Sequence, residues 1–276
     1  SGNLAITGTT TLAAGAANNI TLDNANNFST VAVTNANNVQ LVDTNALDLG
    51  ASTVSGTLRL TAGGSITQSG VLNVTGTSTI DLTTAGTDIL LGSFANDLGA
   101  TAPRFTGTLG NIRDVSFQNV NAGALVPVIA PATTNLSGLT SLRNLTLIYP
   151  NTSINLPGLT ASGTLTITAG ASITDSGPSI VPGTSVLNAG GNITLDEPGN
   201  SFGTVSLAGG TITLVNVTAV NLAGVNASSS FSLQNSGNLT ISSAINSGAS
   251  VSLVSSGGDL IINAGINSGG NMDLRA

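Results

Sequence analysis

The residues FSLQNSGNLTISSAINSGAS (231–250) are followed at once by VSLVSSGGDLIINAGINSGGN (251–271), and MDL (272–274) begins a third copy. The period is about 21 residues, which lies within the range typical of solenoid repeats. Each copy holds two triplets of the form apolar, any, apolar, plus a lone isoleucine, separated by Gly, Asn and Ser. A triplet places two side chains on one face of a β-strand and one on the other. Each copy therefore predicts two or three very short strands joined by turns.

One copy is too small to enclose a core, but stacked copies can share one, because the backbone of each coil then pairs with the coils on either side. The stretch therefore predicts an all-β fold, a parallel β-helix solenoid of short strands and Gly/Asn/Ser turns. At roughly 4.8 Å per coil, 276 residues correspond to about 13 coils and a length of about 60 Å. No segment has the caps and sustained 3.6-residue periodicity of a helix.

The same triplets continue through the first third of the chain. Their central residues, which we expect to face outward, are small or polar except for one leucine: Ala5, Thr21, Ala32, Gln40, Asp48, Arg59, Asn73, Asp81 and Leu90. The chain also contains an internal repeat at longer range. NITLD at 19–23 occurs again at 192–196, and the block FSTVAV at 28–33 resembles FGTVSL at 202–207. We predict one β-helix domain over residues 1–276, with regular coils over 1–93 and 160–276.

The pattern loosens over residues 94–159, where the coils are less regular and the loops longer. This section carries five of the eight prolines, three of the five arginines and the single tyrosine. One interpretation is a few coils with longer turns, and the other is a lateral excursion used for recognition. For the second interpretation, the candidate ligand or partner contacts are Arg104, Arg113, Arg143 and Tyr149.

The composition restricts the partners. Only 6% of residues are charged, the net charge is −7, and all five basic residues are arginines. Nucleic acids and anionic membrane surfaces both require a basic patch, which this composition does not provide. No apolar run approaches the roughly 20 residues of a membrane span. We therefore expect no nucleic-acid partner and no direct insertion into a membrane.

The inventory of reactive groups is small. The chain has no His and no Cys, which excludes a Ser-His-Asp triad, a thiolate nucleophile and a His- or Cys-ligated metal. Gly257-Gly-Asp259 is isolated, and its counterpart in the preceding copy is Asn238, so no calcium-binding repeat forms. A carboxylate pair such as Asp48 and Asp81 is conceivable for glycoside cleavage. We expect no catalytic residue, no metal and no cofactor, and that the protein is not an enzyme.

Frequent asparagines have a structural interpretation. Asn tolerates left-handed turn conformations, and stacked Asn side chains hydrogen-bond along a ladder. The Asn-x-Ser/Thr sequons are about as frequent as this composition produces by chance, so they carry no signal for glycosylation.

Three segments carry a family resemblance: Asn45–Gly70, the GNITLD block at 191–196, and NIRDV at 111–115. They resemble the repeat region of filamentous haemagglutinin-like exoproteins, the large adhesins of bacterial two-partner secretion. The resemblance implies a right-handed β-helix and export to the bacterial cell surface or the extracellular space. It also implies a role in cell adhesion or in building an extracellular matrix such as a biofilm.

We therefore expect a structural shaft or fibre segment of a secreted bacterial adhesin or matrix protein. The triplets reach both ends of the sequence, so the expected partners at the helix ends are the rest of a longer polypeptide or copies that stack into filaments. An alternative is a carbohydrate-binding module that uses residues 94–159 to grip extracellular glycans. A polysaccharide-degrading enzyme is a third, less favoured alternative.

Overall fold

The computed structural model describes residues 2–131 and 135–276, and its regular structure is almost entirely β. In chain order the strands are β1 (Ala5–Gly15), β2 (Ile20–Ala36), β3 (Val39–Asp43), β4 (Leu47–Leu49), β5 (Ser52–Val54), β6 (Leu58–Ala62), β7 (Ile66–Gln68), β8 (Leu72–Val74), β9 (Ser78–Leu82), β10 (Thr87–Leu91), β11 (Arg104–Thr106), β12 (Ile112–Gln118), β13 (Val128–Ile129), β14 (Asn144–Tyr149), β15 (Ile154–Leu156), β16 (Leu159–Thr160), β17 (Leu165–Ala169), β18 (Ile173–Asp175), β19 (Ser179–Ala189), β20 (Ile193–Leu195), β21 (Ser201–Gly209), β22 (Ile212–Asn216), β23 (Val220–Ala227), β24 (Phe231–Asn235), β25 (Leu239–Ile241), β26 (Ile245–Ser247), β27 (Val251–Ser255), β28 (Leu260–Ile262), β29 (Ile266–Ser268) and β30 (Met272–Arg275). A single turn of 3₁₀-helix, η1 (Leu109–Asn111), is the one helical element of these residues.

The strands pair in parallel from one coil to the next, as the repeat predicted. In the last coils, for example, Ile212 pairs with Phe231, Phe231 with Val251 and Val251 with Met272. The differences between these residue numbers are 19, 20 and 21, which are the lengths of successive coils. The predicted β-solenoid of about 13 coils is therefore confirmed.

The chain divides into two compact units, of which the first comprises Ser1–Leu142 and Thr146–Tyr149. Strands of successive coils form columns in this unit, for example β3-β6-β9-β11-β13 and β4-β7-β10-β12. Aliphatic residues of the triplets fill the interior, together with Phe105 and Phe117, whose ring centroids lie 6.1 Å apart. All nine residues predicted to face outward are exposed or half-buried, which confirms the predicted alternation.

Coil formation continues into the section where the sequence pattern loosens. β11 pairs with β9 on one side and with β13 on the other, and β10 pairs with β12. The triplets around Val115, Leu145 and Ile154 all lie in strands, as predicted. The described part of this section is therefore made of coils with longer connections between strands.

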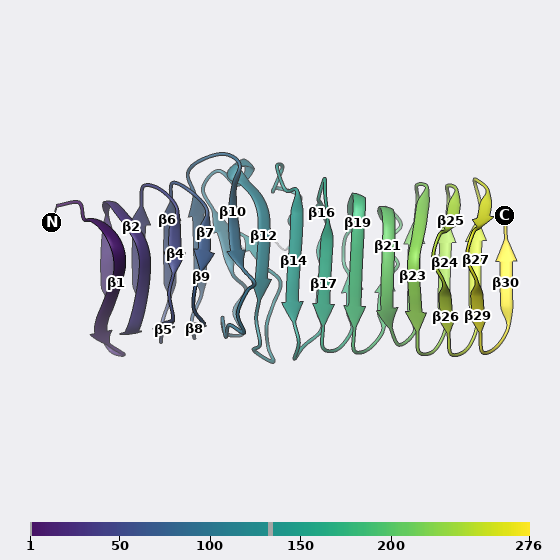
Figure 1. Ribbon diagram of the computed structural model, residues 1–276, viewed down its shortest axis with the longest axis horizontal. Coiled ribbons are helices and arrows are strands. Elements are labelled where there is room, and N and C mark those ends of the chain that lie inside the picture. The colour runs from purple at the N-terminus through teal and green to yellow at the C-terminus, as the bar shows by residue number, and fades with distance from the viewer. Residues whose placement is uncertain (1, 132–134) are drawn as a thin grey trace. The chain divides into compact units, whose positions relative to one another are not determined.

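The second compact unit comprises Arg143–Leu145 and Pro150–Ala276. One of its columns is the seven-stranded sheet β15-β18-β20-β22-β24-β27-β30. Strands β16 and β17 both pair with β19, which is followed by β21 and β23 (Figure 1). β23 pairs with both β25 and β26, and these pair in turn with β28 and β29. The two units were predicted as parts of one domain over 1–276, and this assignment stays a prediction.

Several strands are longer than the predicted triplets. β2 spans 17 residues and contains two triplets, and β1 and β19 span 11 residues each. These strands continue through irregular pairing instead of ending at a turn, because the register between β19 and β21 shifts between Val181 and Thr184. An extra residue of this kind bends a strand without ending it. A triplet count therefore underestimates strand length wherever a corner is made by a bulge.

Candidate functional site

Arg113, one of the predicted contact residues, is held by an ion pair within its own unit. It lies in β12, next to β10, and its Nε and Nη2 donate to Asp88 Oδ1 and Oδ2 at 2.9 and 2.7 Å. Its Nε also lies 3.9 Å from Asp114 Oδ2. A guanidinium group bound to a carboxylate by two parallel hydrogen bonds is fixed in orientation. This arginine therefore joins two successive coils through its side chain.

Arg104 lies in a different column of strands, at the start of β11. Its neighbour in the register is Thr79, which is in turn paired with Arg59. The Nε atom of Arg104 is buried and has no hydrogen-bond partner among the described residues. Nearby, burial raises the pKa of the Asp81 carboxyl, and the positive charge of Arg59 opposes that rise. The register therefore places Arg104 two coils from Arg59, which the sequence analysis did not select.

Tyr149 and Arg143 differ in their exposure. The ring of Tyr149 is completely buried in the first unit, and its hydroxyl donates to the Leu125 carbonyl oxygen at 3.1 Å. Burial also raises the pKa of this phenol. Arg143 is exposed and belongs to the second unit. In this structure Tyr149 is a core residue, and no surface of its side chain is open to a ligand.

The two carboxylates considered for glycoside cleavage lie apart. Asp48 is in β4 and Asp81 is in β9, which belong to different columns of the first unit. Asp48 accepts hydrogen bonds from the hydroxyls of Thr67 and Ser69, at 3.1 and 2.5 Å. Across residues 2–131 and 135–276, no three acidic, His or Cys side chains gather where they could hold a metal ion.

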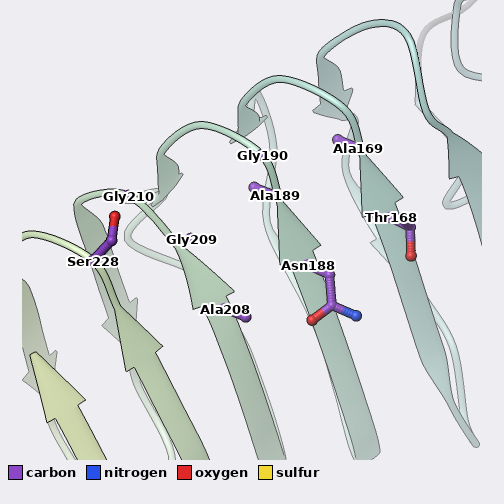
Figure 2. A pocket seen from close by; sticks show the side chains of 9 residues that line it. All are labelled: Thr168, Ala169, Asn188, Ala189, Gly190, Ala208, Gly209, Gly210 and Ser228. Atoms are coloured by element: carbon purple, nitrogen blue, oxygen red, sulfur yellow. The ribbon is translucent and has the colours of Figure 1, made fainter.

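A shallow groove lies on the second unit and crosses β17, β19, β21 and the turn after β23. Figure 2 shows the residues that line it: Thr168, Ala169, Asn188, Ala189, Gly190, Ala208, Gly209, Gly210 and Ser228. A neighbouring groove shares Gly209 and Ser228 and continues past Asn226 and Asn246 to Asn267. Neither lining contains an ionisable side chain. The grooves offer carboxamides and hydroxyls for hydrogen bonding, but no acid or base for catalysis.

Asparagines in these grooves form part of an exposed ladder. The carboxamide of Asn267 donates to Asn246 Oδ1 at 2.8 Å, and that of Asn246 donates to Asn226 Oδ1 at 3.0 Å. Each residue lies directly opposite the next in the register. These contacts confirm the predicted hydrogen bonding of stacked Asn side chains from coil to coil.

A second ladder is buried, which the sequence analysis did not anticipate. Asn216, Asn235 and Ser255 are paired in register and are at most 2% exposed. The carboxamide of Asn216 donates to Asn235 Oδ1 at 2.8 Å, and that of Asn235 donates to the carbonyl oxygens of Gly237 and Asn238. The ladder satisfies the backbone of the turns that follow the strands, which apolar side chains could not do.

A similar arrangement holds a carboxylate. The Asn200 carboxamide donates to Asp175 Oδ2 at 2.6 Å. Burial raises the pKa of the Asp175 carboxyl, and the hydrogen bonds from Asn200 and from the backbone of Asp196 and Glu197 oppose this rise. Asp175 therefore accepts hydrogen bonds from three residues of the turn at 196–200, which connects β20 to β21, and holds this turn against the preceding coil.

Replacing Asn235 by leucine is expected to destabilise the second unit by about 1–3 kcal/mol, because the Gly237 and Asn238 carbonyl oxygens each lose one of their donors and the buried Asn216 carboxamide loses an acceptor. The Asn235→Ser variant is the matched control, since Ser255 in the next coil already donates to the Gly237 and Gly258 carbonyl oxygens. We expect the serine variant to lose less than half as much, measured as the midpoint of urea unfolding. Equal stability of all three proteins would contradict a structural role for the ladder.

The fold and the repeated ladders define the chain as a β-solenoid repeat protein. Residues 1–35, 36–102 and 142–208 match the family described as Repeats of unknown function (DUF5649). These ranges cover more than half of the sequence, and the chain belongs to this family. No curated protein and no solved structure matches the chain. A search of the described residues for a helix long and apolar enough to cross a membrane finds none.

Proposed function

We propose that the chain is a structural shaft or fibre segment of a secreted bacterial surface adhesin or extracellular matrix protein. The observation that supports the proposal is the continuous parallel pairing within each unit, reinforced by side-chain ladders. Such pairing uses nearly every residue to extend the stack by about 4.8 Å per coil. The resemblance of the repeats to filamentous haemagglutinin-like exoproteins supports the adhesin, export and surface location. In this proposal the protein has no catalytic role and no cofactor.

Single-molecule stretching of the whole chain tests the mechanical part of this proposal. Released coils of 19–21 residues should lengthen the molecule in steps of about 70 Å, since an extended chain spans roughly 3.6 Å per residue. A shaft requires resolvable resistance before each step. Smooth extension at the force of an unfolded chain would count against it. Antibody labelling of intact source cells tests the surface location, and labelling only after permeabilisation would exclude it.

A second candidate function is the binding of extracellular glycans. The sequence placed this function in residues 94–159, whereas the observation that favours it is the row of carboxamides in the grooves of the second unit. Asn188 is exposed, and its side chain has no partner in the described part of the chain. Carboxamides in a row suit the hydroxyl groups of an extended polymer.

Retention on immobilised polysaccharides tests this candidate. The double variant Asn188→Ala, Asn246→Ala should elute several-fold earlier than the unmodified chain if the grooves bind glycan. Asn73→Ala, an exposed asparagine of the first unit, is the matched control and should leave elution unchanged. Equal retention of all three proteins would exclude the grooves. A turnover assay on the same glycans would reveal hydrolysis, which the proposal excludes.

A further inference from the structure

Arg59 and Arg104 lie in one row on the outer face of the first unit. The register pairs Arg59 with Thr79 and Thr79 with Arg104. All three side chains alternate with buried residues along their strands, β6, β9 and β11. At about 4.8 Å per coil, the two arginine positions are about 10 Å apart, with a threonine between them. Two guanidinium groups are therefore presented on the same face at a defined spacing.

These two arginines lack the carboxylate partners that other arginines of the chain have. Arg113 and Arg275 each form an ion pair with an aspartate. Neither Arg59 nor Arg104 forms an ion pair or a side-chain hydrogen bond within residues 2–131 and 135–276. The chain has 12 acidic side chains and only 5 basic ones, so a shortage of carboxylates does not explain this. The two guanidinium groups can therefore bind an anion from outside.

A second row on the same face consists of Thr61, Asp81 and Thr106, two residues further along the same strands. The Asp81 carboxylate lies against Gly107 in the next coil, where a Cβ atom would collide with it. Gly107 has a φ of +72°, which also favours glycine. The face thus presents two cations along one row, and one anion flanked by hydroxyl groups along the next.

The two rows together suit a ligand that carries both carboxylates and hydroxyl groups. A guanidinium group binds a carboxylate through two parallel hydrogen bonds. The ionised Asp81 carboxylate only accepts hydrogen bonds, so it favours a hydroxyl group and repels a second anion. A polymer that carries charges alone would meet this repulsion. The outward positions of β6, β9 and β11 also carry no aromatic side chain, so they offer no platform for nucleic-acid bases.

The spacing of the first row selects among such ligands. In an extended polysaccharide with two-fold symmetry, each residue advances by close to one coil spacing, and successive residues turn opposite edges to the protein. Carboxylates on alternate residues therefore face the same way, two coil spacings apart. This spacing matches that of Arg59 and Arg104. The sugar residue between them turns hydroxyl groups toward Thr79.

We propose that the outer face of β6, β9 and β11 binds an extended polysaccharide of uronic acid residues, whose axis follows the stack of coils. Arg59 and Arg104 bind the carboxylates of alternate residues, and Asp81 accepts a hydrogen bond from a ring hydroxyl. The proposal goes beyond the shaft function and does not depend on it. A chain without this ligand can still resist stretching, and a chain that stretches smoothly can still bind it.

Calorimetric titration of the whole chain with β-1,4-linked oligomannuronate tests the proposal. Oligomers of β-1,4-linked mannose are the matched uncharged probe. We expect the affinity for oligomannuronate to rise several-fold from dimer to trimer, because the trimer is the first to present two carboxylates on one side. Added salt should weaken binding, since it screens exposed charges. No binding of the hexamer, or equal binding of the mannose hexamer, would overturn the proposal.

Variants of the two arginines test the site. Arg59→Gln and Arg104→Gln should each lower the affinity about ten-fold, the effect expected for lost hydrogen bonds between charged groups. Arg275→Gln is the matched control, because it removes the same charge from an exposed arginine of the second unit. This control and the groove variant Asn188→Ala, Asn246→Ala should bind as the unmodified chain does. Equal losses at all three arginines would show a response to net charge and contradict the site. Circular dichroism confirms that each variant is folded.

Poly-glutamate tests whether the partner is instead an acidic peptide, because it carries carboxylates without ring hydroxyl groups. It should bind several-fold more weakly than oligomannuronate with the same number of charges. Asp81→Asn removes the repulsion, so it should raise the affinity for poly-glutamate several-fold and change that for oligomannuronate less. An unchanged ratio of the two affinities would contradict the role of Asp81. Binding of poly-glutamate at least as tight as that of oligomannuronate would assign the face to an acidic peptide and overturn the proposal.

Discussion

Replacing Gly170 by valine should destabilise the second unit by about 3 kcal/mol, near the upper end of the usual cost of overpacking. Gly170 lies at the turn after β17, where a Cβ atom would lie 1.8 Å from the Pro150 carbonyl oxygen and 2.4 Å from its carbon. Both atoms belong to the backbone of the preceding coil, so they cannot move without separating two coils. The midpoint of urea unfolding measures the loss.

The same corner is tight in the next coil, where a Cβ on Gly190 would lie 2.2 Å from the Gly170 carbonyl oxygen. Gly265→Ala is the control, because a Cβ at Gly265 meets no atom within 4 Å. We expect this substitution to change the free energy of unfolding by less than about 0.5 kcal/mol. Equal effects at the two glycines would contradict close approach of the coils at this corner.

Raising the pH above about 10 should destabilise the first unit through Tyr149 alone. Burial raises the pKa of this phenol above its value in the unfolded chain. The neutral phenol is therefore retained in the folded state while the unfolded state ionises. Its contribution is fully present below about pH 10 and is lost as the pH rises further, by about 1.4 kcal/mol for each pH unit.

The composition allows the alkaline loss of stability to be assigned to one side chain. Tyr149 is the only tyrosine, and the chain has no Lys, His or Cys, so no other side chain titrates between pH 9 and about 12. Tyr149→Phe should lose about 1 kcal/mol at neutral pH with the hydrogen bond to Leu125, and should show no loss on raising the pH from 9 to 11. A decline of the same steepness in this variant would show that another process limits alkaline stability.

The architecture follows from the sequence because two short-range rules decide it. The triplets determine which side chains face inward, and the 21-residue period determines that coils stack. Strand length does not follow from these rules. β2 joins the triplets at Ile20 and Val31 in one strand, because bulges and not turns make some of the corners. Nothing in the triplet pattern separates a bulge from a turn when both use Asn, Gly and Ser.

The buried ladder was missed for a related reason. Asn216 and Asn235 follow triplets in the same way as exposed turn residues do, but they are the last, inward-facing residues of β22 and β24. One signal was present in the sequence. Asn216, Asn235 and Ser255 recur two residues after the last apolar residue of their triplets. A polar residue that keeps the inward phase of a strand predicts a buried hydrogen-bonding position.

The candidate contact residues were chosen because residues 94–159 hold three of the five arginines and the single tyrosine. The composition of a section does not determine which of its side chains lie near each other in the fold. Pairing register does: it places Asp88 beside Arg113 and brings Arg59 near Arg104, although the latter two are 45 residues apart in sequence. Tyr149 continues the inward alternation of Leu145 and Leu147, which predicts a core position. Alignment of the coils before the choice of residues would have separated these cases.

Distances between spin labels test the stacking of coils most directly. The outward positions Thr174, Thr194, Thr213, Ser232, Ser252 and Asp273 follow one another in register along the second unit. Cysteine pairs that combine position 174 with 232, 252 or 273 are three, four and five coils apart. The account predicts mean distances that grow by about 4.8 Å with each coil, towards about 24 Å for the longest pair. Distances that stay constant, or that alternate as in antiparallel hairpins, would contradict it.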